Sequence, residues 1–393
     1  MMINNSRIFY LFIILFSSCS QTIPDLDLND IETRNQMLER VDNWLQNLSL
    51  KKKFNGAILI SRHGEIDLIN TYGFSDINRK NRLTNQSSFR LASVSKQFTA
   101  MAIMVLNEKG KLNFDDAVNI HLETFPYEDV TIRHLLTHTS GVPDYENLVL
   151  NYKNKSSTKY FFRTGQSKEN ITYSGSPSMY KNYYDILSMK DVLDLVIRFS
   201  DKRKFLAGEK FAYSNTGYVL LAYLVEQISG KTFEGFMDKE IFNTLKMENS
   251  SVWNLNTVPK KLDERVQGTN KERLNDYTWM DGIAGDGAVF VSIEDFIKWD
   301  RALANYSLIS KNTFEQAVNP FITLKGDTSY YGFGWSLSED LSTMDHTGGW
   351  VGASTYIYRN LDSGLLVVIL DSSTNQYMRK IRKSILNLIK NNY

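Results

Sequence analysis

The sequence has a single cysteine, five scattered histidines and almost no net charge, and each of these shortages excludes a class of protein. One cysteine cannot form a disulfide framework, and the scattered histidines give no zinc-finger pattern. The 45 basic residues nearly balance the 44 acidic ones, and no basic run is flanked by aromatic residues, so nothing indicates nucleic-acid binding. With 393 residues, 42% of them apolar, the chain can bury a large core in one or two domains.

The apolar run near the N-terminus is too short to span a bilayer as a permanent helix. It covers 8–16, follows one positive charge, and precedes Ser17, Ser18 and Cys19, which is the layout of a secretory signal. Small residues before a lone cysteine resemble the lipobox of bacterial lipoproteins, although Phe16 stands where leucine is usual. We expect a signal peptide with a lipobox at 1–19, lipid on Cys19 as the only membrane contact, and export to the cell envelope. The alternative is an ordinary signal peptide with an incidental cysteine.

The remaining chain predicts an α+β fold whose central antiparallel sheet is built from both chain ends. Apolar runs around a Gly-containing turn predict a hairpin at 54–72, and strand patterns return at 331–370. Helical periodicity at 31–48 and 378–389 predicts flanking helices. We expect a tether at 20–31 and one domain at 32–393. Its sheet part covers about 32–92 and 281–393, its mainly helical part covers about 93–280, and 152–184 is an irregular surface excursion.

The region around Ser93 and Lys96 is the first candidate for chemistry. Apolar residues from Val94 to Val105 follow a helical stripe, which predicts a buried helix ending at Gly110. Ser93 and Lys96 are three residues apart in its first turn and therefore share one face. A hydroxyl placed there can pass its proton to a buried amine, and the free N–H groups of the turn can bind a developing anion. S-x-x-K alone is a weak signal, because it also occurs at Ser49/Lys52, Ser156/Lys159 and Ser178/Lys181.

Two further patterns follow along the chain. Tyr213 and Asn215 precede an apolar helix that begins near Thr216; taken alone, they are an aromatic anchor and a helix cap. His346-Thr347-Gly348-Gly349 precedes the late strands, where a pair of glycines permits close approach of a ligand or marks a bulge.

Ser93-x-x-Lys96, Tyr213-Ser-Asn215 and His346-Thr-Gly348, in this order, resemble the three motifs of serine β-lactamases and penicillin-binding proteins. The resemblance is strongest to the branch of class C β-lactamases, D,D-peptidases, esterases and D-aminopeptidases, and it covers about residues 35–390. Connecting text also matches, at 135–145, 241–250 and 283–295. Three motifs in order with matching connections are specific, although each alone is not.

The resemblance implies a role for each motif residue. Ser93 is the nucleophile, Lys96 its proton partner and Tyr213 the base whose phenolate Lys96 stabilises. Asn215 binds the substrate amide, and the N–H groups of Ser93 and Gly349 form the oxyanion hole, on a strand with His346, Thr347 and Gly348 that binds substrate. No cofactor and no metal are implied. Penicillin-directed members have lysine where this chain has His346, and histidine offers a carboxylate little charge near pH 7, which favours esters or D-amino-acid peptides as substrates over β-lactams.

Competing sites are less well supported. His134 and His138, four residues apart, could share a helix face as a zinc-binding pair, but Leu135 replaces the catalytic glutamate of that motif and no third ligand is evident. Asp286, between two glycines, is interpreted as a turn residue. Two function classes stay open: a serine hydrolase that forms an acyl-enzyme on D-amino-acid peptides, peptidoglycan-like substrates, esters or β-lactams, and a penicillin-binding or sensor module with little turnover.

Overall fold

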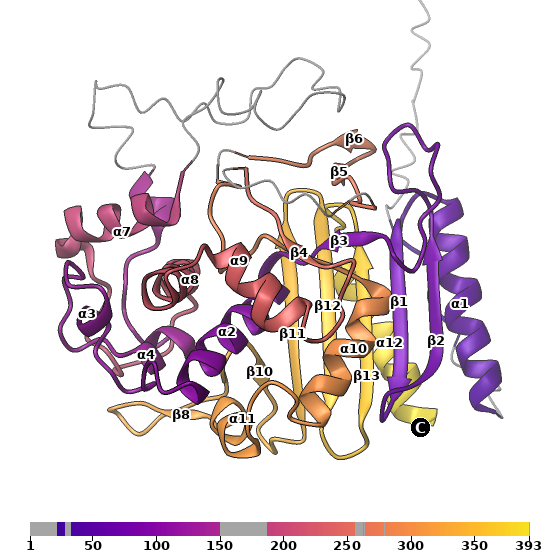
Figure 1. The fold of residues 1–393 in the computed structure, drawn as a ribbon. Coiled ribbons are helices and arrows are strands. Elements are labelled where there is room, and N and C mark those ends of the chain that lie inside the picture. The colour runs from indigo at the N-terminus through magenta and orange to yellow at the C-terminus, as the bar shows by residue number, and fades with distance from the viewer. Residues whose placement is uncertain are drawn as a thin grey trace, which may run out of the picture.

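The computed structural model describes residues 22–27, 33–149, 187–255, 262, 264–278 and 280–392. The predicted signal peptide, Cys19 and the surface excursion expected at 152–184 lie outside these residues. The described chain forms a central sheet with helices on both faces and a helical region beside one edge (Figure 1). No helix in these ranges is long and apolar enough to cross a membrane.

The central sheet has six strands in the order β10-β11-β12-β13-β1-β2, with antiparallel pairing throughout. Its strands are β1 (Gly56–Arg62), β2 (Glu65–Tyr72), β10 (Ser336–Leu337), β11 (Thr343–Trp350), β12 (Ala353–Asn360) and β13 (Leu365–Asp371). The N-terminal hairpin pairs with the last strand, with Gly56 opposite Asp371. The prediction of an α+β fold with one sheet built from both chain ends is therefore confirmed.

The middle of this sheet is buried on both faces, which explains the unbroken apolar runs in the sequence. Along β1, Ala57 and Leu59 belong to the large core shared with the helical region, whereas Ile58 and Ile60 point to a second core on the opposite face. β13 is buried along its whole length and alternates between the two cores in the same way. Period-two alternation thus divides one apolar run between two layers.

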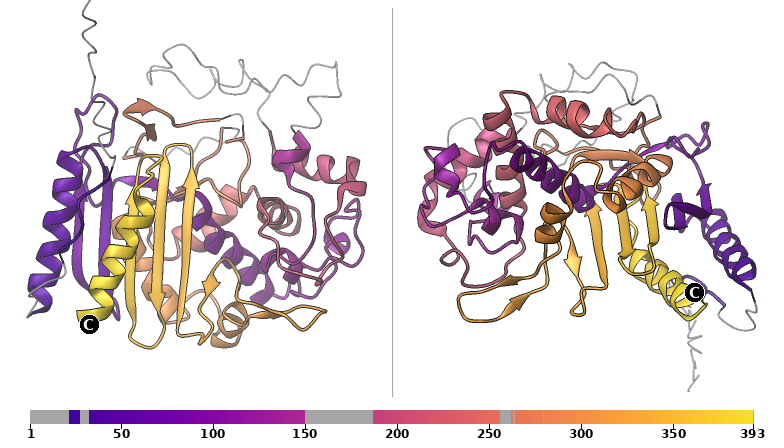
Figure 2. Two further views of the ribbon diagram at one scale, coloured as in Figure 1. Left: turned by 180° about the vertical axis from the view of Figure 1, so that it is seen from behind. Right: turned by 60° about the horizontal axis from the view of Figure 1, so that its bottom comes forward.

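Two helices, α1 (Arg34–Leu50) and α12 (Met378–Asn392), cover the face with the second core, and they lie side by side on the back of the sheet (Figure 2). Residues 22–27 also pack there, with Ile23 and Leu26 buried. The Trp44 indole donates to the Pro24 carbonyl at 3.2 Å, and the Lys380 ammonium donates to the Ile23 carbonyl at 2.7 Å. Part of the segment expected as a tether at 20–31, residues 22–27, therefore packs against the folded domain.

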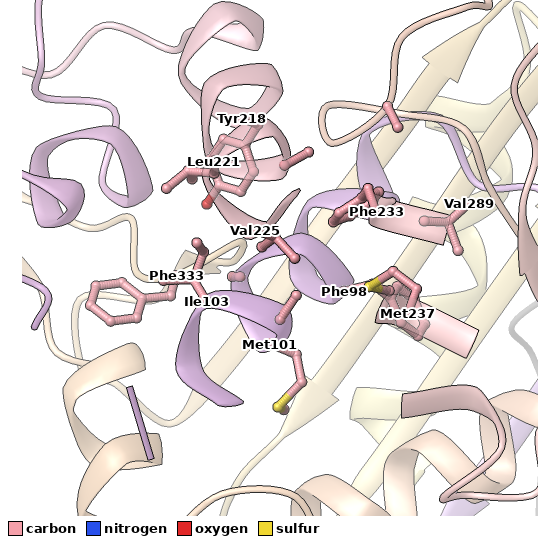
Figure 3. Close-up of a cluster of buried hydrophobic side chains, with 14 of the residues drawn as sticks. Phe98, Met101, Ile103, Tyr218, Leu221, Val225, Phe233, Met237, Val289 and Phe333 are labelled. Atoms are coloured by element: carbon pink, nitrogen blue, oxygen red, sulfur yellow. The ribbon is translucent and has the colours of Figure 1, made fainter. Parts of the chain in front are cut away.

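The helical region lies beside the β10 edge of the sheet and shares the core of the other face (Figure 1). Its helices are α2 (Lys96–Glu108), α3 (Val118–His121), α4 (Ile132–Leu136), α7 (Met189–Arg198), α8 (Asn215–Ser229) and α9 (Phe233–Met237), with short turns η2 (Ser200–Lys202) and η3 (Asp238–Phe242). After them, α10 (Ile293–Ala304) and α11 (Lys311–Ala317) return to the sheet side. Side chains of α2, α8 and α9 meet in one core (Figure 3), where the Phe98 ring stacks on Trp299 with centroids 4.2 Å apart. Aromatic stacking of this kind adds to the burial of apolar area.

A small second sheet joins the two regions. It contains β3 (Ser88–Arg90), β7 (Val289–Ser292) and β4 (Ser251–Val252), in the order β3-β7-β4. Two-stranded pairs are formed by β5 (Thr269–Asn270) with β6 (Arg273–Leu274), and by β8 (Phe321–Ile322) with β9 (Thr328–Ser329). The chain therefore enters the Ser93 region from a strand, which fixes the direction in which the next turn leaves the sheet.

Candidate active site

Ser93 lies in a short 3-10 turn, η1 (Ala92–Ser95), and α2 begins only at Lys96. The expected helix thus starts later than its apolar stripe suggested, and it ends at Glu108, two residues before the expected end at Gly110, which has φ of +64°. Ala92 has φ of +50°, a left-handed conformation that costs a residue with a side chain about 1–3 kcal/mol. A hydrogen bond from the Val289 N–H to the Ser95 hydroxyl, at 3.2 Å, stabilises this strained turn.

Strand β11 passes close to this turn because Gly348 has no side chain. A Cβ on Gly348 would lie 2.2 Å from the Leu91 carbonyl oxygen and 2.2 Å from the Thr355 hydroxyl. The Thr355 hydroxyl donates to the same Leu91 carbonyl at 2.6 Å, which ties β12 to the chain two residues before Ser93. Glycine at this position is therefore required by the close approach of two backbones.

Lys96 is fully buried and donates three hydrogen bonds. Its Nζ contacts the Ser93 hydroxyl at 3.2 Å, the Asn215 side-chain oxygen at 2.9 Å and the Asp286 carbonyl at 2.8 Å. A lysine ammonium has three protons and no lone pair, so all of its donors are used. In its ammonium form Lys96 orients Ser93 and has no lone pair to accept the serine proton, so in that form another group has to take it.

Tyr213, the residue expected to be the base, lies beside Lys96. Its ring is 39% exposed, and the Lys96 ammonium lies 4.9 Å from its centroid. Within the described chain the Tyr213 hydroxyl has no hydrogen-bond partner. Ser214, the next residue, is the N-cap of α8, with its hydroxyl accepting the Gly217 N–H at 3.2 Å. The second motif is thus a helix start, as expected, with the phenol placed just ahead of it.

Asn215 links the first two motifs to the rim of the cleft. Its side-chain oxygen accepts a hydrogen bond from Lys96, and its Nδ2 donates to the Glu146 carboxylate at 3.0 Å. This pattern determines the orientation of the amide, because an ammonium can only donate and a carboxylate can only accept.

His346 is buried on β11, and its two ring nitrogens are both engaged. Nδ1 lies 2.7 Å from the Thr347 carbonyl and Nε2 lies 2.9 Å from the Tyr331 hydroxyl. A carbonyl only accepts, so Nδ1 carries the proton and Nε2 accepts from Tyr331. Burial and the nearby positive charge of Lys96 lower the pKa of His346 to about 3. The imidazole is therefore neutral, as the sequence suggested, but its ring is not among the residues that line the cleft.

The free edge of β11 faces the nucleophile. The Thr343 carbonyl accepts the Ser338 N–H at 3.0 Å on the β10 side, and β10 pairs only with Met344 and Asp345. Backbone groups alternate between the two edges of a strand, so the N–H of Gly349 points to the same side, past the end of β10. Gly349 and Ser93 both line the cleft, and a side chain on Gly349 would meet open space.

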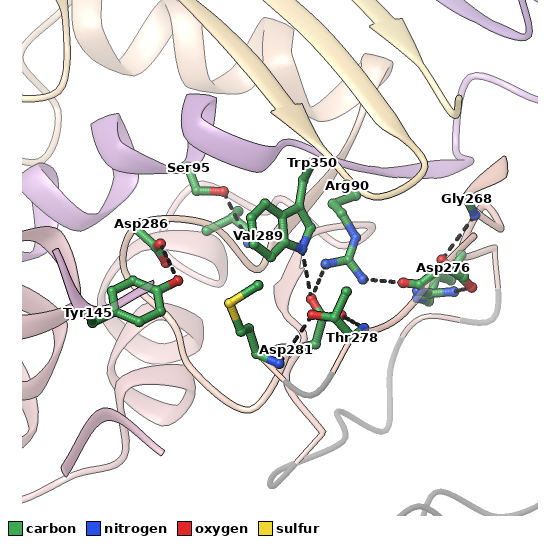
Figure 4. A network of polar contacts seen from close by, with 12 residues as sticks. Arg90, Ser95, Tyr145, Gly268, Asp276, Thr278, Asp281, Asp286, Val289 and Trp350 are labelled. Atoms are coloured by element: carbon green, nitrogen blue, oxygen red, sulfur yellow. Dashed lines mark hydrogen bonds and ion pairs between the residues drawn. The ribbon is translucent and has the colours of Figure 1, made fainter. Parts of the chain in front are cut away.

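The cleft has a volume of about 220 Å³, and its described lining is acidic. Arg90 is its described cation, and it is paired with Asp281 at 2.6 Å and with the Asp276 carbonyl at 2.8 Å (Figure 4). Glu146 and Asp286 contribute carboxyl groups. Burial raises the pKa of Asp286 to about 6, against the opposing charge of Lys96, and the Tyr145 hydroxyl donates to it at 3.2 Å.

Several of these residues had no signal in the sequence. The sequence predicts Asp286 as a turn residue, yet its backbone carbonyl accepts a hydrogen bond from Lys96 and the residue lines the cleft. Glu146 and Tyr331 belong to no motif that we had singled out. Their partners lie 69 and 15 residues away, so only the folded chain brings them together.

His134 and His138 do not form a zinc-binding pair. α4 ends at Leu136, and His138 has φ of +58°, so the two residues do not share a helix face. The Nδ1 of His134 accepts the Thr131 N–H at 3.1 Å, whereas the Nδ1 of His138 accepts the Ser214 N–H at 3.1 Å. Among the described histidine, cysteine, aspartate and glutamate side chains, no group of three is placed to hold a metal ion.

The chain belongs to the beta-lactamase family, whose model matches residues 41–388. It is similar to penicillin-binding protein 4* of Bacillus subtilis, with 33% identity over 88% of this chain and 74% of that protein. It is also similar to the protein flp of Staphylococcus aureus, with 24% identity over 88% of this chain, but it spans only 65% of that relative's length.

Solved structures share the fold. A penicillin-binding protein from Bacillus halodurans superposes with a TM-score of 0.69 at 27% identity, covering 88% of this chain and 98% of that one. A D-amino acid amidase from Ochrobactrum anthropi SV3 superposes with a TM-score of 0.67 at 19% identity, covering 91% of this chain and 98% of the other. At that identity the second likeness shows the fold alone.

Proposed function

We propose that this protein is a serine hydrolase that forms an acyl-enzyme on Ser93 and acts on D-amino-acid peptides, including peptidoglycan-like ones, or on esters. The observation that carries the proposal is the Lys96 ammonium, which contacts the Ser93 hydroxyl while its other two protons are held by Asn215 and Asp286. A fully engaged cation beside a hydroxyl orients it for attack and favours negative charge on a neighbouring base.

The reaction divides into two steps. In the first, the Ser93 oxygen bonds to the substrate carbonyl carbon, and its proton passes to the Tyr213 phenolate. The phenol then protonates the leaving amine or alcohol as the old acyl bond breaks. The N–H groups of Ser93 and Gly349 hold the negative charge of the carbonyl oxygen. In the second step, a water gives a proton to the Tyr213 phenolate as its oxygen bonds to the ester carbonyl carbon. The phenol then protonates the Ser93 oxygen as the acyl bond breaks, which releases the acid and restores both residues.

The charges of the cleft support this choice of substrate. The neutral, enclosed imidazole of His346 offers no cation for a substrate carboxylate, and Arg90 is neutralised by Asp281. Glu146 and Asp286 add negative charge. A penicillin carries a carboxylate and would lose affinity here, whereas an uncharged ester or an amide would not.

Slow acylation by penicillins is a second candidate, favoured by the 33% identity to a penicillin-binding protein. In that case Ser93 would be acylated without rapid release. We also propose an envelope location, since bacterial penicillin-binding proteins are among the relatives, and a lipid on Cys19 as the anchor.

One experiment separates these functions. The purified protein and Ser93→Ala are exposed to a fluorophosphonate, to a penicillin and to D- and L-alanyl esters, and adducts are located by mass spectrometry while turnover is followed. We expect fluorophosphonate labelling of Ser93, turnover of the D-ester and little penicillin adduct. A lasting penicillin adduct without ester turnover would favour the second candidate. Undiminished turnover by Ser93→Ala would refute both.

A further inference from the structure

His138 accepts hydrogen bonds from the backbone N–H groups of both residues that flank Tyr213. Its carbonyl accepts the Ala212 N–H at 2.8 Å, and its Nδ1 accepts the Ser214 N–H at 3.1 Å. A residue that is distant in sequence therefore holds the backbone by hydrogen bonds immediately before and after Tyr213.

The His138 ring also lies against the Tyr213 ring. Their centroids are 4.3 Å apart, and the rings of Tyr331, Tyr218 and Phe211 lie 4.4, 5.0 and 5.9 Å from His138. The histidine thus fills an aromatic enclosure of which the Tyr213 ring is one wall. Because the Lys96 ammonium lies 4.9 Å from the Tyr213 centroid, a shift of this ring changes the distance between the phenol and the cation.

This position is costly for a histidine. His138 is fully buried, and its Nε2 has no hydrogen-bond partner. Nδ1 accepts a hydrogen bond and is therefore unprotonated, so in the neutral ring Nε2 carries the hydrogen. This leaves a buried donor unsatisfied, which costs about 1–3 kcal/mol. The backbone is left-handed as well, with φ of +58°. A residue chosen for packing alone would avoid both costs.

We propose that His138 is a positioning residue that holds the Tyr213 ring beside the Lys96 ammonium, through its two hydrogen bonds to the flanking N–H groups and its ring contact. The proposal rests on the proposed function, in which Tyr213 takes the Ser93 proton. His138 does not touch substrate; it acts only through the tyrosine.

The test compares His138→Leu, which removes the side-chain acceptor of the Ser214 N–H, with His138→Asn, which keeps a side-chain acceptor and tolerates left-handed φ. His134→Leu is the matched control, because it deletes an imidazole that accepts a backbone N–H in the same segment but does not contact Tyr213. We expect His138→Leu to lower kcat for an activated ester by roughly tenfold to a hundredfold with little change in KM, as a misplaced catalytic group does. His138→Asn should recover most of kcat. His134→Leu should lower Tm while kcat stays within about threefold.

The decisive measurement repeats His138→Leu in a Tyr213→Phe background. If His138 acts through the phenol, the second substitution costs nothing further in acylation rate. An equal loss in both backgrounds would overturn the proposal. If Tyr213→Phe alone leaves the rate unchanged, the proposed base is wrong, which is a different failure. If His138→Leu does not fold, His138→Asn replaces it in both backgrounds, and an equal loss of kcat with and without the Tyr213→Phe substitution overturns the proposal.

Discussion

The Lys96 ammonium and the Asn215 side-chain oxygen are 2.9 Å apart, although the two residues are separated by 119 positions in the chain. This contact joins the turn that carries Ser93 to the start of α8, where Tyr213 precedes the helix. The proposed nucleophile Ser93 and the proposed base Tyr213 therefore both lie next to the Lys96 side chain, and a change in one motif should affect the other.

We expect the losses from Lys96→Ala and Tyr213→Phe not to add. Each substitution should slow acylation by about a hundredfold or more, because general-base assistance to serine is lost in both. The double variant should be no slower than the worse single one, since the two groups act as one proton-transfer unit. Single-turnover acylation by an activated ester measures this, with Tm values as the check on folding. Fully additive losses would show that the two residues act independently.

His346→Lys should move the preference toward penicillins. A lysine ammonium could hold the penicillin carboxylate by a charge-assisted bond worth roughly 1.5–3 kcal/mol. That corresponds to about tenfold to a hundredfold in the ratio of kcat/KM for penicillin to kcat/KM for ester at pH 7. His346→Gln, which is uncharged, serves as the control and should leave the ratio unchanged. A wild type that already prefers penicillins would contradict the role given to His346.

The stability of the fold should depend on pH through His346. Its pKa is about 3 in the folded protein against 6.5 for an ordinary histidine, so between these values the unfolded chain binds more protons. Stability from the neutral ring is therefore present above pH 6.5 and is lost as the pH falls toward 3. Relative to His346→Gln, the wild type should lose up to about 1.4 kcal/mol per pH unit in this window. Urea unfolding at pH 7.5, 6 and 5 tests this, and a constant difference between the two proteins would refute it.

Gly348→Ala and Gly349→Ala should differ sharply although the residues are adjacent. A Cβ at Gly348 would lie 2.2 Å from the Leu91 carbonyl oxygen, whereas one at Gly349 meets open space. We expect Gly348→Ala to destabilise the protein by about 1–3 kcal/mol and to slow acylation, because β11 has to move away from the Ser93 turn. Gly349→Ala should change stability by less than about 0.5 kcal/mol. Thermal unfolding of both variants is the measurement, and equal Tm losses would argue against the close approach.

The sequence predicted the parts of this protein that local pattern encodes. Two apolar runs around a Gly-containing turn located the hairpin at 54–72, and helical periodicity located α1, α2 and α12. The order of the three motifs identified the candidate site, because it is a property of the chain itself. The start of α2 was misplaced, since an apolar stripe carries no information about the strained turn at Ala92.

The remaining contacts of the site depend on tertiary structure. Lys96 meets the Asp286 carbonyl across 190 residues, and a backbone carbonyl leaves no trace in the residue type. The Tyr331 hydroxyl on His346 of β11 and the Glu146 carboxylate on Asn215 of α8 are likewise single contacts between separate elements. Periodicity cannot predict such contacts, because each depends on where two segments of the folded chain come to lie in space.

The packing of residues 22–27 onto α12 has a consequence for how far the domain could reach from a membrane. Ile23 is already buried in the second core. With a lipid on Cys19, only 20–22 would separate the anchor from the folded domain, and three extended residues span at most about 11 Å. Such a short linker would keep the domain next to the bilayer surface. Substrates would then have to come to the enzyme, because the enzyme could not move outward to meet them.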